Sequence, residues 1–460
     1  MSTNLFSSLH VGASSVRAHS QGIDVVGQNL ANVGTPGHAK RRTDFDTVSL
    51  SAGGGVRAGE LRAIRNEALE TGLRRETSEH ASADARASSL SQVDRYFGDG
   101  AFEPLSGLLQ GFYDSLSAAS VDGNLGSRRH DVVAHLDELA AGVRTTASFL
   151  RDERRRIDQS LEGGVEDLNS LLQEIAQLNE AIDGEKDGAD QQPMLDQLTG
   201  RLVELSELVD VHVRVNEAGG RDVSLRSGEP LVLGRSAVSF RSSGNASNAG
   251  LSDVLLGGFD LQETDVTASL QGGRLGGLLE ARDGSLQGME QRLDEIVVAL
   301  ADELDTLHAA GLESDGVTPG GPLFEARSTT DPAMDFAVSA TLLSDPSRLA
   351  LGDASDELGN VATLLATRDA GLLDGGTLSA RHAFDELSQQ VGFDVRQAER
   401  ERDLRGALLD DALASRELHS GVSIEESSID LIRYQRGLEA ATNLIRQVDE
   451  MLDQLMSIGL

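Results

Sequence analysis

Side chains that could carry chemistry are numerous in this chain, but they do not form the patterns that catalysis or metal binding requires. The ten histidines are scattered, with no His-Glu-x-x-His zinc motif and no Gly-x-Ser-x-Gly nucleophile elbow. Cysteine is absent, which excludes thiolate metal sites, disulfides and cysteine nucleophiles. The 75 acidic residues neither identify nor exclude a paired-carboxylate cleft. We therefore expect no catalytic residue, no cofactor and no metal site.

Two loops imitate binding motifs without completing them. Residues 272–277, GGRLGG in one-letter code, resemble a glycine-rich phosphate loop but lack the Lys-Ser/Thr ending, which favours a turn before a helix. Residues 183–188, DGEKDG, begin like an EF-hand between two helices. The twelfth position is Met194, where a bidentate glutamate is needed. We interpret this loop as the solvated tip of a helical hairpin.

Two further features have structural interpretations. The run RDERRR at residues 151–156 could be a basic contact patch, but its acidic neighbours on a long helix favour an exposed face. His19 lies inside an apolar stripe, where a polar residue is more often a packing or register feature than a ligand.

The two ends of the chain carry matching apolar stripes with a seven-residue repeat. The N-terminal stripe contains Leu5, Leu9, Val16, Ile23, Val26 and Leu30, with Gly12 and His19 at two further positions of the repeat. The C-terminal stripe contains Ile424, Leu431, Tyr434, Leu438, Ile445, Val448, Leu452 and Leu455. One helix cannot bury such a stripe alone, so each end needs a partner helix, from this chain or from neighbouring copies. These residues are our predicted assembly interface.

A second apolar face lies beside the C-terminal stripe, formed by Leu444, Met451 and Ile458. A helix with two apolar faces can bury one on its partner and the other on a neighbouring subunit. This pattern favours a subunit that polymerises over the alternative of a plain intramolecular helix pair.

Hydrophobic periodicity predicts a mostly α-helical fold of the α+β class, with paired terminal helices, a long helical middle and a small inserted β domain. A helix of roughly 50 residues is expected from Asp131 to Asp183, and alternating apolar residues replace the helical pattern after Asp210. The expected segments are: 1–45, N-terminal helix and turn of an inner coiled-coil domain; 46–210, first part of a helical rod-like domain; 211–272, β-rich outer domain; 273–311, returning helix; 312–348, loop; 349–422, last part of the helical domain; 423–460, C-terminal helix of the inner domain.

Composition narrows the function classes. The formal charge of −35 argues against nucleic-acid binding, because phosphate backbones are bound by excess lysine and arginine. No segment approaches the ~18 apolar residues that a membrane span needs, and the first 15 residues lack the basic and apolar regions of a Sec signal peptide. We therefore expect no membrane insertion and no cleavable signal.

The segment Asn29–His38, NLANVGTPGH, resembles the N-terminal signature of the bacterial flagellar axial family of rod, hook and hook-associated proteins. Its turn motif comprises Ala31, Asn32, Thr35, Pro36 and Gly37. Gly34 stands where Asn or Ser is usual, and His38 where an aromatic is usual. Residues 420–426, 431–436 and 449–453 are similar to the conserved C-terminal end of the same family.

Three middle segments resemble members of this family that join the hook to the filament. They are residues 195–209, residues 272–283 and the His308–Gly311 end of the following helix. Some members carry a large extra domain after the equivalent of Leu323-Phe324, so the resemblance implies that 312–348 is a vestige of that domain.

The resemblance implies a structural, non-enzymatic subunit of the flagellum, located outside the cell at the hook-filament junction and exported by the flagellar type III apparatus. Its implied partners are copies of itself, the hook protein, a second hook-associated junction protein and an export chaperone. The alternatives are another axial component, such as a hook or distal rod protein, and a cell-wall-acting enzyme.

Overall fold

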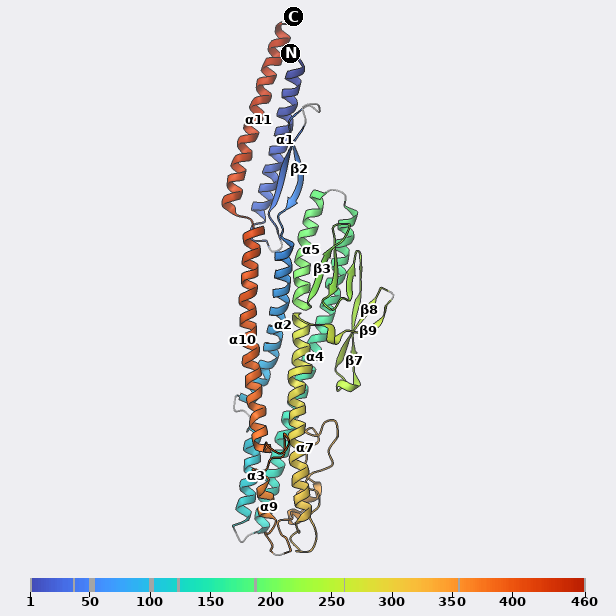
Figure 1. Ribbon diagram of the computed structural model, residues 1–460, viewed down its shortest axis with the longest axis vertical. Helices are drawn as coiled ribbons and strands as arrows, with labels where there is room; N and C mark the ends of the chain where they lie inside the picture. The colour runs from blue at the N-terminus through green and yellow to red at the C-terminus, as the bar shows by residue number, and fades with distance from the viewer. Residues whose placement is uncertain are drawn as a thin grey trace.

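The computed structural model describes residues 2–35, 38–48, 54–98, 103–121, 125–185, 188–259, 261–354 and 356–458. Its long helices run along one axis, and the terminal helices α1 (Ser2–Ala31) and α11 (Ile424–Ile458) pair at one end (Figure 1). The body contains α2 (Glu67–Gly98), α3 (Leu105–Ala119), α4 (Leu125–Gly184), α5 (Gly188–Leu208), α7 (Gln287–Ala310) and α10 (Ala380–Ser420). The α+β class with predominant helix is confirmed, as is the pairing of the terminal helices.

Helix α4 is the longest element of the described chain, with 60 residues against the roughly 50 expected. Its apolar rows are buried along the whole length, as Leu136, Leu161 and Ile182 illustrate with no exposed surface. One part of α4 packs in a core with α3, α7 and α10, and the other with α5 and the strands. Within the described residues, no helix has the length and apolar character needed to cross a bilayer.

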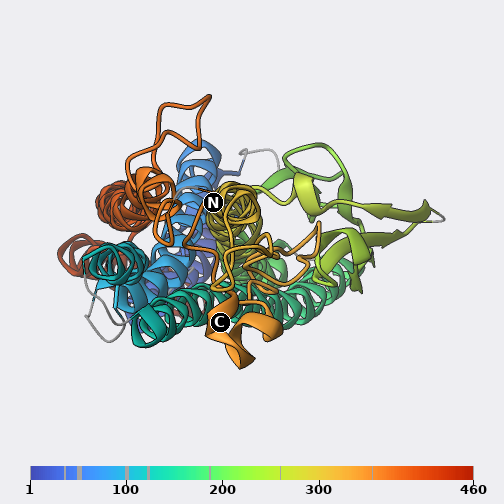
Figure 2. The same cartoon turned by 90° about the horizontal axis from the view of Figure 1, so that it is seen from below.

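The described strands after Asp210 form two antiparallel sheets. The first has the order β3 (Val211–Val215), β4 (Arg221–Leu225), β5 (Pro230–Leu233) and β6 (Ser236–Ala237). The second has the order β7 (Ser239–Gly244), β8 (Ser252–Gly258) and β9 (Leu261–Asp265). Seen along the long axis, these strands project to one side of the helices (Figure 2). The change from helical to alternating periodicity at Asp210 therefore coincides with the start of β3.

A β-hairpin close to the N-terminal helix was not predicted. Strands β1 (Arg41–Thr47) and β2 (Val56–Ala63) pair antiparallel, with Arg41 opposite Ala63 and Thr47 opposite Val56. The hairpin packs on α1, so the structural unit of the N-terminal helix extends beyond residue 45. Its exposed charged residues conceal the alternation that usually identifies a strand.

The segment 312–348, expected to be a loop, is part of the core. It includes the short helices α8 (Ala340–Ser344) and η5 (Pro346–Arg348), and Leu323, Phe324 and Phe336 are at most 2% exposed. Its backbone is held by α7, since Asp305 Oδ1 accepts a 2.7 Å hydrogen bond from the Leu323 amide. The expected helical segment 349–422 is also irregular before α10, apart from α9 (Val361–Ala366).

His308, near the end of α7, is a buried connector between two parts of this irregular region. Its Nδ1 lies 2.7 Å from the Gly321 carbonyl, and its Nε2 accepts a 2.8 Å hydrogen bond from the Ala350 amide. The carbonyl can only accept, so the proton of the neutral ring is on Nδ1. Burial lowers the pKa of His308, which keeps the ring neutral and suited to both bonds.

Asp294 on α7 provides a test of these side-chain connections. Its Oδ1 accepts a 2.9 Å hydrogen bond from the Ala333 amide, and burial raises its pKa to about 6. A raised pKa means that the carboxyl stabilises the fold fully below pH 3.8 and loses this contribution as pH rises through about 6. Asp294→Asn should therefore increase the free energy of unfolding by about 1 kcal/mol at pH 8, allowing for solvent screening. Urea unfolding should show the gain disappearing below pH 4; an equal gain at all pH values would contradict this account.

The glycine-rich segment 272–277 is a packing element that begins α6 (Gly273–Leu279). Gly272 and Gly273 have φ angles of 67° and 59°, in the left-handed region that favours glycine. A Cβ atom at Gly277 would lie 2.2 Å from the Ser82 carbonyl oxygen on α2. The glycines thus allow α6 to contact the backbone of α2, which explains the sequence without a phosphate ligand.

Gly277→Ala should destabilise the helical body by about 3 kcal/mol, because the clash is with backbone and not with a flexible side chain. Gly288→Ala is the matched control, since nothing lies within 4 Å of a Cβ there and alanine favours an exposed helix by up to about 1 kcal/mol. Thermal unfolding followed by circular dichroism would compare the two. Equal stability of both variants would show that α6 does not depend on this contact.

The run at residues 151–156 is not a wholly exposed face, which corrects the prediction. Arg154 is only 4% exposed, and it binds Glu290 at 2.6 Å and the Asn248 side chain at 2.7 Å. Beside it, Arg282 of the π-helical turn η4 (Glu280–Leu286) is fully buried and bonded to Asp158 and Asp283. This network, which we call the arginine network, connects α4, η4, α7 and the strand region. Of the run, Asp152, Arg155 and Arg156 are exposed.

Candidate assembly interface at the terminal helices

Helices α1 and α11 approach closely because glycine lies opposite a large side chain at three points. A Cβ at Gly12 would lie 2.7 Å from Cγ1 of Ile445, and one at Gly22 would lie 3.1 Å from the Tyr434 ring. On α11, a Cβ at Gly437 would lie 2.6 Å from the His19 ring. Gly12 and His19 interrupt the apolar stripe in the sequence, but in the structure they take part in this alternation of small and large residues.

The predicted stripe residues fall into three groups by exposure. Tyr434, Val448 and Val26 are buried at the centre of the pair. A half-buried group lies at its margins: Leu5, Leu9, Val16, Ile23, Leu431, Leu438, Ile445 and Leu452. Leu30 and Ile424 are exposed, at 38% and 55%. The side chain of Leu455 lies outside the described residues. The central row of α11 is therefore Ser427, Tyr434, Ala441 and Val448, and not the row that begins at Ile424.

The predicted second face is uncovered in the single chain. Leu444 and Met451 are 36% and 47% exposed, and the side chain of Ile458 lies outside the described residues. Together with the half-buried margin of Leu438 and Ile445, these side chains leave apolar surface on both sides of the central row.

Three aromatic rings join the hairpin to the helix pair. Phe45 of β1 lies 5.9 Å from His19 and 5.6 Å from Tyr434 between ring centroids, edge-on to both. Such edge contacts contribute about 0.5–1.5 kcal/mol each beyond the buried area. The sequence pattern did not identify Phe45, because it lies outside the helical stripes.

The family turn motif positions the chain where α1 ends. Buried Asn29 makes two bonds to Arg41: its Nδ2 donates to the carbonyl at 2.8 Å, and its Oδ1 accepts from the amide at 2.9 Å. Ala31 is the last residue of α1, and Asn32 donates from Nδ2 to the Gln28 carbonyl at 2.8 Å. The side-chain amide of Asn29 thus bonds both backbone groups of Arg41, as a neighbouring strand would, and this holds the β1-β2 hairpin against α1.

Gly34 follows the helix with a φ of 75°, the left-handed conformation that commonly ends a helix. The Thr35 amide donates to the Asn32 carbonyl at 3.0 Å, and its own carbonyl accepts from His38 at 3.2 Å. Pro36 and Gly37, the other predicted members of the motif, lie outside the described residues.

Asp196 of α5 connects this junction to the helical body. Its carboxylate accepts from Arg41 at 2.7 Å, bonds Arg65, and lies 3.3 Å from His38 Nδ1. The Asp196 side chain is 14% exposed, so these bonds are shielded from solvent and salt. Asp196 belongs to the quoted segment 195–209, and His38 takes the place of the usual aromatic. Two sequence signatures that are far apart in the chain therefore meet at one carboxylate.

The arrangement is one of packing, hydrogen bonds and ion pairs between elements. No group of three or more histidine, aspartate or glutamate side chains in the described part of the chain is placed to hold a metal ion. The geometry can therefore fix the angle between a terminal helix pair and a rigid body.

Comparison with known families agrees with this architecture. The model of the flagellar hook-associated protein FlgK helical domain matches residues 90–324, just over half of the chain. The chain belongs to the FlgK family of flagellar hook-associated proteins. A second model, for the C-terminal region of flagellar basal body rod FlgEFG proteins, matches residues 418–458, which include α11. The FlgK family consists of structural proteins of the flagellum.

Individual relatives support the assignment. Flagellar hook-associated protein 1 of Bacillus subtilis is 25% identical over 99% of this chain and 98% of its own length. The Salmonella typhimurium protein of the same name is 26% identical over 66% of this chain and 56% of its own length. The solved structure of the flagellar hook junction protein FlgK from Burkholderia pseudomallei aligns with a TM-score of 0.66 at 14% identity, over 75% of this chain and 99% of that one. At this identity the structural match supports the fold alone.

The FlgK-like segments have identifiable structural roles in this chain. The segment 195–209 supplies Asp196, the segment 272–283 supplies the α6 glycines and Arg282, and the end of α7 supplies His308. The roles of Asn29, Arg41 and Arg65 were missed, because a hydrogen bond or ion pair between distant segments leaves no periodic trace in the sequence.

Proposed function

We propose that this protein is a subunit of the junction between the flagellar hook and filament, and that it assembles through its terminal helices. The observation that supports this most directly is the incomplete burial of the α1-α11 pair. One central row is buried, while Leu444, Met451 and Ile424 are 36–55% exposed. Large apolar side chains exposed on both sides of a buried row favour a partner that covers them. Neighbouring copies would cover them.

The terminal helices would form an inner layer that becomes fully ordered on assembly. Burying a leucine or isoleucine completely contributes about 1.5–3 kcal/mol. The margins of α1 and α11 are only half-buried in the single chain, so assembly would gain much of this stabilisation. The rigid helical body would surround this layer, with the strand region of β3 to β9 facing outward.

We further propose partners and a route of export from the family membership. The partners would be copies of this chain, the hook protein, a second hook-associated junction protein and an export chaperone. The chain would pass unfolded through the flagellar type III apparatus, and it would act without enzymatic activity.

Electron microscopy of cells that lack this gene, with an assay for flagellin in the medium, tests the proposed function. Complete hooks without filaments, together with released flagellin, are expected. Absent or truncated hooks would move the assignment to a hook or distal rod component. Normal flagella would overturn the flagellar role, and loss of cell-wall cleavage activity would favour an enzyme.

A further inference from the structure

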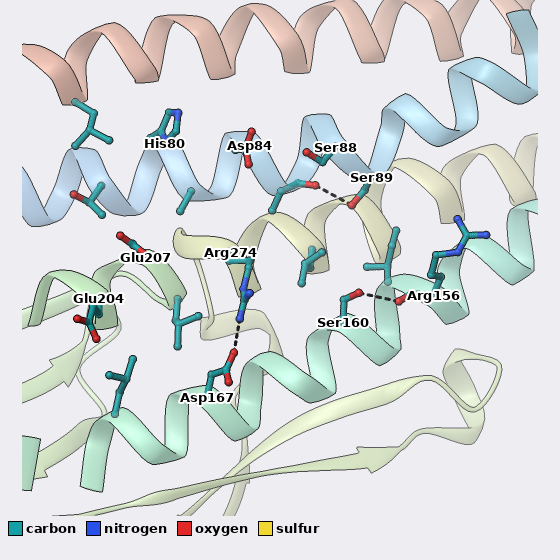
Figure 3. Close-up of a pocket in the computed structure, with 18 of the residues that line it drawn as sticks. His80, Asp84, Ser88, Ser89, Arg156, Ser160, Asp167, Glu204, Glu207 and Arg274 are labelled. Atoms are coloured by element: carbon teal, nitrogen blue, oxygen red, sulfur yellow. Dashed lines mark hydrogen bonds and ion pairs between the residues drawn. The ribbon is translucent and has the colours of Figure 1, made fainter. Parts of the chain in front are cut away.

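A groove on the helical body has the form of a helix-binding site. It is an open cavity of about 920 Å³ between α2, α4, α5 and α6, and Leu409 of α10 also lines it (Figure 3). Apolar side chains line it, including Ile157, Leu171 and Leu278, and the α2 wall carries small residues such as Ala85 and Ser88. Small residues along one wall leave room for a second helix to approach.

The groove carries negative charge that the chain itself does not neutralise. Arg274 is paired with Asp167 at 2.8 Å, and Glu204 with Arg201 at 2.5 Å. In the described part of the chain, neither Asp84 nor Glu207 lies within salt-bridge distance of a basic side chain. Burial, followed by repulsion from Glu204, raises the pKa of Glu207. The groove therefore favours a partner that brings positive charge.

An exposed stripe on α10 has the complementary chemistry. Phe393, Leu404 and Leu408 are 49%, 60% and 40% exposed, and at 100° per residue they fall within about 60° of the helix circumference. Arg396 and Arg400 lie at the edge of this stripe, and neither has an ion-pair partner in the part of the chain that is described. We call these five residues the α10 stripe.

The α10 stripe and the groove also match in length. Phe393 and Leu408 are 15 positions apart, about 22 Å along a helix, and the groove wall from Thr77 to Gln92 on α2 has the same span. Leu409, the α10 residue that lines the groove of its own chain, lies about 100° or more around the helix from Phe393, Leu404 and Leu408. The stripe thus faces away from the groove of its own chain, and only another copy can bring the two together.

We propose that the α10 stripe of one copy docks in the groove of the next copy, with Arg396 and Arg400 facing the carboxylates of Asp84 and Glu207. The contact is heterologous, so it extends from copy to copy and can close into a ring. It lies on the helical body and is separate from the terminal helices. The inference rests on the proposed function for the presence of neighbouring copies in the flagellum.

Site-directed crosslinking tests this contact, and the cysteine-free chain gives a clean background. Ser88→Cys and Leu404→Cys variants, carrying different epitope tags, would be expressed together in cells lacking the native gene. Mild oxidation of isolated flagella should produce a dimer that carries both tags. Leu418→Cys is the matched control: it lies on the same side of α10 and is 90% exposed, but ten residues beyond Leu408. It should crosslink to Ser88→Cys at least about tenfold less.

Charge-reversal variants provide a second test of the proposed contact. Arg396→Glu with Arg400→Glu should reduce the mixed dimer about tenfold or more, because like charges then meet across the contact. Asp84→Lys with Glu207→Lys in the partner copy should restore it. Variants that enter flagella normally without a mixed dimer, or with dimers of Leu404→Cys alone, would overturn the contact. Absence of the tagged chain without any cysteine from isolated flagella would overturn the proposed function itself, and the contact with it.

Discussion

Replacing Ile445 with aspartate should abolish incorporation of the protein into flagella while leaving the helical body folded. Ile445 lies over Gly12 at the half-buried margin of the helix pair. The substitution removes an apolar side chain and places an unpaired carboxylate in a site that assembly would bury. Together these changes cost about 3–5 kcal/mol per subunit contact, a weakening of more than 100-fold.

Immunoblots of isolated flagella and swimming assays would measure this effect. Asn443→Asp is the matched control, because it adds the same charge to α11 at an exposed position and should enter flagella normally. Urea unfolding of the purified Ile445→Asp chain should retain the main transition of the body. Normal incorporation of Ile445→Asp would mean that this margin of α11 has no neighbour in the flagellum.

The sequence predicts an element well where one local period dominates. The heptad rows locate α1 and α11, the long 3.6-residue pattern locates α4, and the change at Asp210 locates β3. The sequence does not predict an element whose backbone hydrogen bonds are made by side chains of distant segments. The β1-β2 hairpin depends on Asn29 for one of its pairings, and the 312–348 segment depends on Asp294, Asp305 and His308 of α7. Neither dependence has a periodic signature.

The candidate interface was also only partly predictable. Periodicity identifies which residues face the partner helix, but the row that becomes central depends on where small residues permit close approach. Gly12, Gly22 and Gly437 make that choice, and they bring the row of Tyr434 and Val448 to the centre. The burial of charged residues was also not predictable. Arg154 lies in a charged run that is typical of an exposed helix face, but Glu290 and Asn248, which are distant in sequence, bind it in a buried position.

Arg282→Met should destabilise the protein more than any other arginine substitution considered, because it removes the centre of the arginine network. Arg282 is fully buried, donates to the Ser252 carbonyl at 2.9 Å, and is paired with Asp158 and Asp283. Without it Asp158 loses its cation, and Asp283 keeps only the longer ion pair with Arg154 at 3.4 Å. We expect a cost of about 3–5 kcal/mol in this shielded site. Because Ser252 begins β8, the strand region should also become loosely attached and more sensitive to limited proteolysis.

The pH dependence of this loss separates an electrostatic cause from a loss of packing. Burial would raise the pKa of Asp283, but hydrogen bonds from Arg282 and Asn248 outweigh it and lower the pKa. Because its pKa is lowered in the folded protein, ionised Asp283 stabilises the fold above pH 3.8, the unfolded pKa. This stabilisation is lost as the pH falls through the folded pKa. The difference in unfolding free energy between native protein and variant should therefore be largest at neutral pH and shrink on acidification. Arg274→Met, whose ion pair with Asp167 is exposed, should cost less than about 1 kcal/mol. A loss for Arg282→Met that did not vary with pH would indicate that its packing, and not its charge, holds the strand region to the helices.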